Sequence, residues 1–174
     1  MRAPEWNVRR VETIDDALIE GLTDVLIDCV EGDASVSFMR PLTRSRALAF
    51  WRRVRDAVAA GERVLLVAAD DQGLCGTVQL TLDLPENQPH RADVSKMLVH
   101  RRARRKGLGA ALMCGAEAAA RERGRTLLVL DTASEEAKRL YERLGWIRVG
   151  VIPDYALLPR GGYCDTTVYY RKLD

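Results

Sequence analysis

The sequence predicts an α/β fold with a mixed sheet. Three observations lead to this prediction: helical periodicity alternates with short β-branched runs, one region has the order strand, helix, strand, and a turn-rich segment separates two neighbouring runs as in a hairpin. The strand, helix, strand unit requires a right-handed crossover and parallel pairing. The chain has 174 residues, enough to bury one hydrophobic core, and we expect residues 1–174 to form a single domain.

The amino-terminal half is expected to hold a short strand, two helices and a hairpin. Apolar residues recur at helical spacing after Asp15 and Asp16, which can cap a helix, and a second helical stretch ends at Gly61. Two runs rich in leucine and β-branched residues then flank the turn sequence Asp-Asp-Gln-Gly at 70–73. The predicted ranges are 8–11 for the strand, 14–30 and 43–60 for the helices, and 63–69 and 77–83 for the hairpin.

The carboxyl-terminal half is expected to alternate strands with helices. Leu108, Leu112 and Ala116 share one side of a helix that stops at Gly124, and a later helix stops at Gly145. Residues 153–165, rich in proline, glycine and aromatics, are predicted to form a loop that serves as a substrate lid or as a subunit contact. The predicted ranges are 92–99, 126–130, 146–151 and 167–172 for strands, and 107–123 and 135–144 for helices.

The composition is that of an ordinary globular protein, 47% apolar and 30% charged. No stretch approaches the ~20 apolar residues of a membrane span, and residues 1–6 lead into charged sequence, so we expect a cytoplasmic protein without a membrane partner. The net charge of +2 gives no general argument for a nucleic-acid partner. The cysteines are scattered, with no C-x-x-C pair and no histidine at zinc spacing, so the sequence predicts neither disulfides nor a metal site. These cysteines are Cys29, Cys75, Cys114 and Cys164.

A basic, glycine-containing segment lies between the strand at 92–99 and the helix that starts near Gly107. A helix start offers unpaired backbone N–H groups and a positive dipole end, and glycines let a phosphate approach the main chain. By itself, the basic run equally fits a solvated face or a nucleic-acid patch. The nucleotide P-loop pattern is absent because Lys106 precedes the glycines. The Rossmann pattern fits Gly107 and Gly109 but has Leu112 in place of its third glycine.

The pattern R-x-x-G-x-G, at Arg104, Gly107 and Gly109 after a strand that ends Met-Leu-Val, resembles the acetyl-CoA loop of the GNAT superfamily of N-acetyltransferases. Residues 137–146, A-K-R-L-Y-E-R-L-G-W, resemble the family's A-x-x-L-Y-x-x-x-G-F with tryptophan for phenylalanine. The resemblance covers most of the chain and implies acetyl-CoA as co-substrate, without a metal. It also implies a mostly antiparallel central sheet with one parallel strand pair splayed around acetyl-CoA, flanked by about four helices.

A closer likeness, to the tabtoxin-resistance type of acetyltransferase, runs through residues 32–39, 91–94, 130–132 and 148–150. It implies a small amino-acid-like amine as acceptor, similar to tabtoxinine-β-lactam, and a role in antibiotic resistance. Other amines, including polyamines and protein amino termini, suit the same chemistry, so the sequence leaves the acceptor open. It also leaves open a non-catalytic CoA-binding domain. The strands predicted near the carboxyl terminus, 146–151 and 167–172, are compatible with a homodimer.

The resemblance also implies which residues bind the cofactor. The diphosphate would lie on the backbone of residues 104–110, with side-chain charge from two arginines and a lysine, and pantetheine would pair with the end of the preceding strand. One N–H of that strand would stabilise the oxyanion. Simple packing would explain the strand residues equally well. The implied cofactor-binding residues are Leu98, Val99, Arg104, Arg105, Lys106, Gly107, Leu108, Gly109 and Ala110.

Two carboxylates are candidates for the catalytic base. Direct transfer needs an unprotonated amine, whereas an alkylammonium with a pKa of ~10.4 is only about one part in two thousand neutral at pH 7. Asp131 stands at the carboxyl end of a predicted parallel strand, where α/β sheets place their ligands, and Asp93 lies within a strand. Each also has a structural interpretation, Asp131 as a helix cap and Asp93 as the partner of Arg91 or Lys96.

Tyr141 is the candidate general acid. It matches the family's position for this role, and a phenol with a pKa near ~10 can protonate the departing CoA thiolate. The alternative is an ordinary core residue on the apolar stripe of its helix. The implied reaction is direct transfer in a ternary complex without a covalent enzyme intermediate. An acyl-cysteine route would need a thiol beside a base, but Cys114 falls inside a predicted helix.

Overall fold

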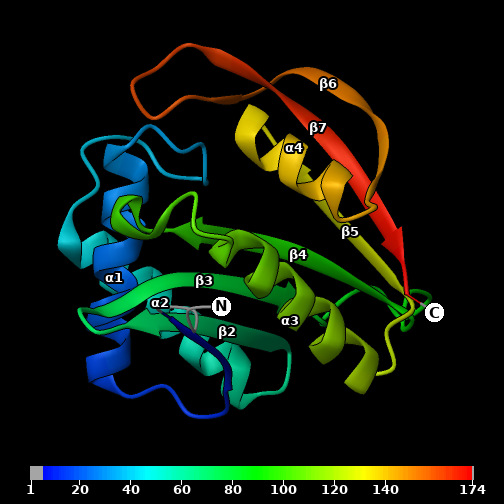
Figure 1. The fold of residues 1–174 in the computed structure, drawn as a ribbon, viewed down its shortest axis with the longest axis horizontal. Helices are drawn as coiled ribbons and strands as arrows, with labels where there is room; N and C mark the ends of the chain where they lie inside the picture. The colour runs from blue at the N-terminus through cyan, green and yellow to red at the C-terminus, as the bar shows by residue number, and fades with distance from the viewer. Residues whose placement is uncertain (1–5, 174) are drawn as a thin grey trace.

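The computed structural model describes residues 6–173, which form a seven-stranded sheet with helices on both faces (Figure 1). The strand order is β1-β2-β3-β4-β5-β7-β6. Residues 1–5 lie outside the described residues, and with them most of the segment 1–6 that argues against a secretory signal. The strands are β1 (Asn7–Val11), β2 (Arg63–Asp70), β3 (Gly73–Thr81), β4 (Arg91–Val99), β5 (Leu127–Thr132), β6 (Ile147–Leu157) and β7 (Tyr163–Lys172). The helices are α1 (Asp16–Glu31), α2 (Arg44–Ala59), η1 (Arg101–Ala103), α3 (Leu108–Glu122) and α4 (Glu135–Arg143).

One face of the sheet is covered by α1 and α2, and the other by α3 and α4 (Figure 1). Side chains alternate along β2: Leu65 and Val67 pack with α1 and α2, whereas Leu66 and Ala68 pack with α3. Small residues bring α3 close to the sheet, since a Cβ on Gly115 would lie 2.8 Å from Leu66 Cδ2. Both faces are therefore buried, which explains the nearly continuous apolar sequence of β2.

The parallel pair β4–β5 is joined only near one end. Pairing covers three positions and ends at Asp93 opposite Val129. Beyond this point β4 carries a bulge at Lys96 and Met97, where its antiparallel register with β3 shifts. The two strands then diverge (Figure 1). The expected mixed, mostly antiparallel sheet with one splayed parallel pair and four α-helices is confirmed.

Two predicted boundaries were wrong. β3 begins at Gly73 instead of residue 77, because Gly73, with φ 111°, directly follows a two-residue turn and pairs with Asp70. Gly76 continues the strand for a packing reason. A Cβ there would lie 3.0 Å from Leu112 of α3, so the glycine makes room for the helix.

The second difference is the segment 153–165, which mostly forms a β-hairpin and not a loop. β6 continues to Leu157, β7 starts at Tyr163, and residues 158–162 connect them. β6 is the last strand of the sheet order, where Pro153 is tolerated because its missing N–H removes no ladder bond to a further strand. An irregular register between Ile152 and Ala156 accommodates the proline and the positive φ of Asp154, 51°.

Candidate active site

A cavity of about 640 Å³ opens where β4 and β5 diverge. Its walls come from segments far apart in the sequence: the bulged half of β4, the start of α3, the end of β5, and α4. The loop between α1 and α2 and the β6–β7 hairpin complete the lining. Every residue predicted for the site lines this cavity except Asp93 and Lys106.

The start of α3 forms one end of the cavity. Gly107 has φ 85°, and no side chain among the described residues caps the first N–H groups of the helix. These N–H groups and the positive end of the helix dipole favour a bound anion. Gly107 is needed for its conformation, since an added Cβ would meet nothing within 4 Å. Gly109 is needed for space, since a Cβ would lie 3.0 Å from Leu140 Cδ2.

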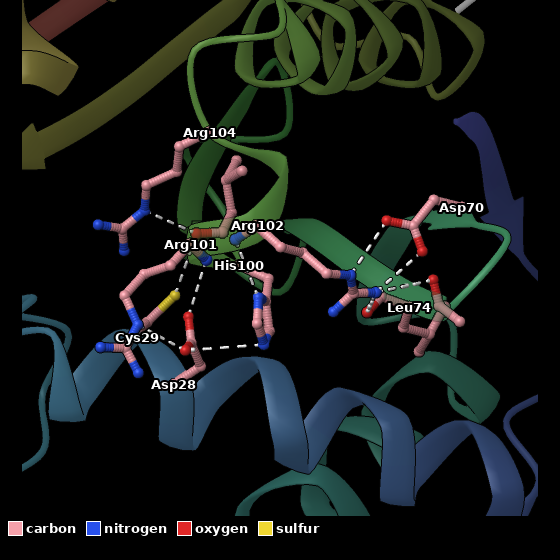
Figure 2. Close-up of polar contacts among 10 residues, drawn as sticks. Asp28, Cys29, Asp70, Leu74, His100, Arg101, Arg102 and Arg104 are labelled. Carbon is pink, nitrogen blue, oxygen red and sulfur yellow. Dashed lines mark hydrogen bonds and ion pairs between the residues drawn. The ribbon is translucent and has the colours of Figure 1, made fainter. Parts of the chain in front are cut away.

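Two aspartates hold the segment that precedes α3 (Figure 2). Asp28 of α1 accepts hydrogen bonds from the Arg101 backbone N–H at 2.9 Å and from Arg101 Nε at 2.7 Å. Asp70, at the end of β2, accepts from the Arg102 guanidinium at 3.1 Å and 3.0 Å. Arg102 also donates to the Leu74 carbonyl at 2.9 Å. The segment is therefore tied to α1 and to the β2–β3 hairpin.

Asp28 is charged despite its burial. Burial by itself raises the pKa of this carboxyl, but hydrogen bonds from Arg101 and the charges of His100 and Arg101 bring the pKa below its ordinary value. Its side chain is only 9% exposed, so water screens these interactions little. Sequence reasoning missed this anchor because the contact joins residues 73 positions apart and no local pattern marks it.

The basic run is divided between two tasks. Arg101 and Arg102 form the anchoring ion pairs, whereas Arg104 and Arg105 line the cavity. Lys106 lines a separate hollow beside the β2–β3 turn. The positive charge next to the start of α3 is therefore smaller than the sequence indicates.

Cys29 of α1 also lines the cavity, at the end of β4. Its thiol donates to the Val99 carbonyl at 3.6 Å, and Arg104 Nε donates to the same oxygen at 3.0 Å. Burial raises the pKa of the Cys29 thiol, although Arg104 opposes the shift. A neutral thiol is a poor nucleophile, so this geometry does not favour an acyl-cysteine route. Cys114 is exposed on α3, and all four cysteines are free.

Tyr141 reaches the cavity from α4 and is 5% exposed. Its ring packs against Trp146 and Tyr169, with centroids 5.9 Å away in both cases. Burial raises the pKa of the phenol well above its ordinary value, and the charge of Asp131 raises it further. Tyr141 is therefore a protonated group inside the cavity at neutral pH.

Asp131 enters the cavity from the end of β5, where Thr166 Oγ1 donates a hydrogen bond to its carboxylate at 2.6 Å. The preceding residue, Leu130, packs in the same hydrophobic cluster as Tyr141, on the α3 and α4 face. Alternation along the strand then places Asp131 on the opposite face of the sheet. Asp131 and Tyr141 thus meet the cavity from opposite sides, at the place where the two strands diverge.

Asp93 does not line the cavity, and it forms an ion pair of the kind predicted from the sequence as its structural interpretation. It pairs with Arg91 at 3.4 Å and not with Lys96. Burial raises the pKa of Asp93, Arg91 opposes the shift, and the charge of Asp131 adds to it. Its Oδ1 atom is buried without a hydrogen-bond partner among the described residues.

The far end of the cavity is closed by contacts between the α1–α2 loop and the β6–β7 hairpin. Asp33 accepts from Arg160 Nε at 2.8 Å and from Arg40 at 3.2 Å. The backbone N–H of Arg40 donates to the Pro159 carbonyl at 2.9 Å, and its guanidinium pairs with Glu31 at 2.6 Å. Residues from both segments line the cavity, so this closure limits access from that side.

The comparison with known families identifies the class of protein. The profile of the acetyltransferase (GNAT) domain matches residues 61–148, half of the chain. The chain belongs to the GNAT family of acetyltransferases, and it is an enzyme of the acyltransferase class. Within residues 6–173, no group of three or more His, Cys, Asp or Glu could hold a metal ion, and no helix is long and apolar enough to cross a membrane.

Solved structures share the fold at low sequence identity. The yncA protein of Salmonella typhimurium, solved with its cofactor acetyl-CoA, is 21% identical with a TM-score of 0.78, covering 98% of this chain and 95% of that one. A phosphinothricin acetyltransferase from Sinorhizobium meliloti, in complex with acetyl-CoA, is 18% identical with a TM-score of 0.78, covering 97% and 89%. A ribosomal-protein-alanine N-acetyltransferase from Brucella melitensis is 20% identical with a TM-score of 0.77, covering 96% and 99%.

Proposed function

We propose that this enzyme transfers the acetyl group of acetyl-CoA directly to the primary amine of a small molecule. The observation that carries the proposal is the single cavity that holds an uncapped helix start, a protonated Tyr141 and the Asp131 carboxylate where β4 and β5 diverge. We take the whole chain to be one catalytic domain, working in the cytoplasm. Acetyl-CoA-bound relatives of the same fold support the choice of co-substrate.

The cofactor is assigned to the β4 end and the α3 start. Its diphosphate would accept from the first N–H groups of α3, in residues 107–110, with charge from Arg104 and Arg105. Lys106 precedes this turn but lines the hollow beside the β2–β3 turn, so we assign the phosphate charges to the two arginines. Pantetheine would follow the main chain of Leu98 and Val99 into the gap between the strands.

In the proposed reaction, Asp131 and Tyr141 act on opposite sides of the thioester, and the acetyl group passes from CoA to the amine. The acceptor ammonium gives a first proton to Asp131, which provides the route for a deprotonation that costs roughly 4.6 kcal/mol for an alkylammonium at pH 7. The amine nitrogen then bonds to the thioester carbon and releases its second proton to solvent, the carbon–sulfur bond breaks, and Tyr141 protonates the CoA thiolate. Asp93 has no place on the cavity wall, and the charge of Asp131 contributes to its raised pKa, so we assign it no direct part in the transfer.

The acceptor is assigned to the amino-acid-like amines, in the manner of tabtoxinine-β-lactam, with a role in antibiotic resistance. Closure of the far end by Asp33, Arg40 and Arg160 favours a compact acceptor over a polypeptide segment. The resemblance of residues 32–39 to the tabtoxin-resistance type falls on this same loop, which lines the cavity. A phosphinothricin acetyltransferase among the structures of similar fold is consistent with this acceptor class.

An acetyl-CoA turnover screen tests the proposal. Purified protein is mixed with acetyl-CoA and chemically distinct amines, including β-lactam amino acids, free amino acids, polyamines and peptides with free amino termini, and release of free thiol is followed. We expect turnover with amino-acid-like amines. Turnover with peptides alone would instead define a protein amino-group acetyltransferase. Thermal stabilisation by acetyl-CoA without turnover of any amine would define a CoA-binding domain.

The anchoring aspartate gives a first prediction for the cofactor side. Asp28→Ala removes both hydrogen bonds to Arg101, so the segment before α3 loses its tie to α1. We expect the KM for acetyl-CoA to rise about fivefold with kcat nearly unchanged, and the free energy of unfolding to fall by about 1.5–3 kcal/mol, because the lost bonds join charged groups. Steady-state kinetics and denaturant unfolding measure the two effects.

Asp24→Ala is the matched control for this prediction. Asp24 lies one turn earlier on α1 and pairs with exposed Arg44 on α2, with no contact to the segment before α3. We expect the KM for acetyl-CoA of this variant to equal that of the wild type. An equal KM for the Asp28 and Asp24 variants would show that the α1 tie does not position the cofactor loop.

We further propose that the protein is a homodimer formed through β6. This last strand of the sheet exposes apolar side chains along its length, with Ile147 at 52%, Val149 at 64% and Tyr155 at 55% exposure. Long exposed apolar edge strands tend to be covered by another chain. We expect light scattering to give twice the monomer mass, and Val149→Glu to give the monomer mass. A monomeric wild type at micromolar concentration contradicts this proposal.

A further inference from the structure

Lys96 occupies an unusual position in β4. Its φ of 50° is in the left-handed region, which is sterically disfavoured for a residue with a side chain. The bulge also changes which way the side chain faces. In regular alternation Lys96 would share the face of Val94, which packs toward α3, but its contacts are with Ser37 and Phe50 on the α1 and α2 side. A disfavoured backbone thus presents a lysine to the acceptor side of the cavity.

The Lys96 ammonium is a half-buried cation whose contacts within residues 6–173 include no anion. Its Nζ donates to Ser37 Oγ at 3.0 Å and lies 5.8 Å from the centre of the Phe50 ring. No carboxylate within residues 6–173 forms an ion pair with it. Burial lowers the pKa of Lys96, and the charge of Arg63 lowers it further. Because an ammonium has three donors and Ser37 accepts from one, Lys96 retains the capacity to bind an anion.

Asp131 supplies the opposite charge in the same cavity. It lines the wall from β5, whereas Lys96 lines it from β4, and the divergence of these strands separates the two groups. They form no ion pair, yet the charge of Asp131 raises the pKa of Lys96, so the two groups share one electrostatic environment. The acceptor end therefore offers one cation and one anion that do not neutralise each other.

We infer that Lys96 binds an anionic group of the acceptor, so that the enzyme selects amines that also carry a carboxylate. This inference rests on the proposed function and narrows its acceptor class. We place the ammonium of the acceptor at Asp131 and the carboxylate of the acceptor at Lys96. Lys96 is oriented by its hydrogen bond to Ser37, and Asp131 by the hydrogen bond from Thr166. Free amino acids and their analogues meet both requirements. Simple amines, polyamines and peptide amino termini carry no carboxylate next to the reacting nitrogen.

Matched acceptors test the inference on the wild-type enzyme. Each free L-amino acid of a panel is compared with its amide and with its decarboxylated amine, for example phenylalanine, phenylalaninamide and phenethylamine, at saturating acetyl-CoA. We expect the acids to have kcat/KM at least about tenfold above their amides. Equal use of acids and amides would overturn the inference but leave amine acetylation intact. Absence of transfer to every amine would overturn the proposed function, and the inference with it.

Three variants assign the selectivity to Lys96. Lys96→Met keeps the apolar stem and removes the charge, and we expect the acid-to-amide ratio of kcat/KM to fall about tenfold, toward one. Lys96→Arg keeps the charge and should retain most of the ratio. Lys172→Met is the matched control, because Lys172 is exposed at the end of β7 and does not line the cavity. If Lys96 had a merely structural role, Lys96→Met would lower kcat/KM equally for acids and for amides, and that result would refute the assignment.

Discussion

Tyr141→Phe is expected to lower kcat by about 10²-fold, with the KM for acetyl-CoA within about twofold of the wild-type value. The phenyl ring keeps the packing against Trp146 and Tyr169, so the change removes a hydroxyl and little else. General-acid catalysis typically contributes 10²–10⁴-fold, and loss of a group that acts only in the transition state lowers kcat and kcat/KM together. Steady-state kinetics with the best acceptor of the amine screen measures this effect.

The pH profile gives a second test of the same role. Burial and the charge of Asp131 raise the pKa of Tyr141, and a raised phenol pKa favours the neutral, protonated form. The proton therefore remains available well above the ordinary phenol value of ~10. We expect no fall of wild-type kcat between about pH 8 and 10 from loss of this proton. A descending limb in that range that disappears in Tyr141→Phe would contradict the burial argument.

Tyr169→Phe is the control for the Tyr141 variant. Tyr169 is a fully buried neighbour in the same cluster, donates its hydroxyl to Glu142 at 2.9 Å, and does not line the cavity. We expect this variant to lose stability, because it removes a hydrogen bond to a charged group, while kcat stays at the wild-type level. If both tyrosine variants have wild-type kcat, Tyr141 is a core residue and the acid has to be found elsewhere.

Gly107→Val is expected to raise the KM for acetyl-CoA about tenfold or more, equivalent to about 1.4 kcal/mol of binding free energy. Gly107 has φ 85°, where a β-branched residue is strongly disfavoured. An added Cβ meets nothing within 4 Å, so we expect the effect to come from the backbone conformation. Relief of the strain would rotate the first N–H groups of α3 away from the diphosphate position.

Gly61→Val separates cofactor binding from general destabilisation. Gly61 follows α2, has φ 75°, and an added Cβ there also meets nothing within 4 Å. Both valine variants carry the same kind of strain, of about 1–2 kcal/mol, so their free energies of unfolding should fall by similar amounts. Only Gly107→Val should change acetyl-CoA affinity. Equal affinities in the two variants would place the diphosphate away from the α3 start.

In the cofactor loop, local sequence predicted the glycines but not the roles of the basic residues. Gly107 and Gly109 could be read from their spacing, since backbone conformation and close approach depend on residue type at a single position. The sequence could not predict which basic residues form ion pairs and which face the cavity. Arg101 turns to Asp28 and Arg102 to Asp70, contacts that exist only after α1 and the β2–β3 hairpin have packed around the segment.

The catalytic candidates differ in the same way. Tyr141 lies within a local motif and Asp131 at the end of a predicted strand, so both could be named from the sequence, and the structure brings both to one cavity. Both Asp93 and Asp131 were candidate bases in the sequence, but only Asp131 lies beyond the last paired residues, where the strands have separated. Lys96 had no signal at all, because a β-bulge depends on the register between two strands.

By itself, the sequence determined the order of helices and strands, the crossover between β4 and β5, and the glycines at the start of α3, because periodicity, caps and turn residues act over a few neighbours. The tertiary structure alone decided which charges face the cavity, where β4 and β5 separate, and that residues 153–165 extend a hairpin. These features depend on strand register and on ion pairs between distant segments, and neither leaves a pattern in the linear chain.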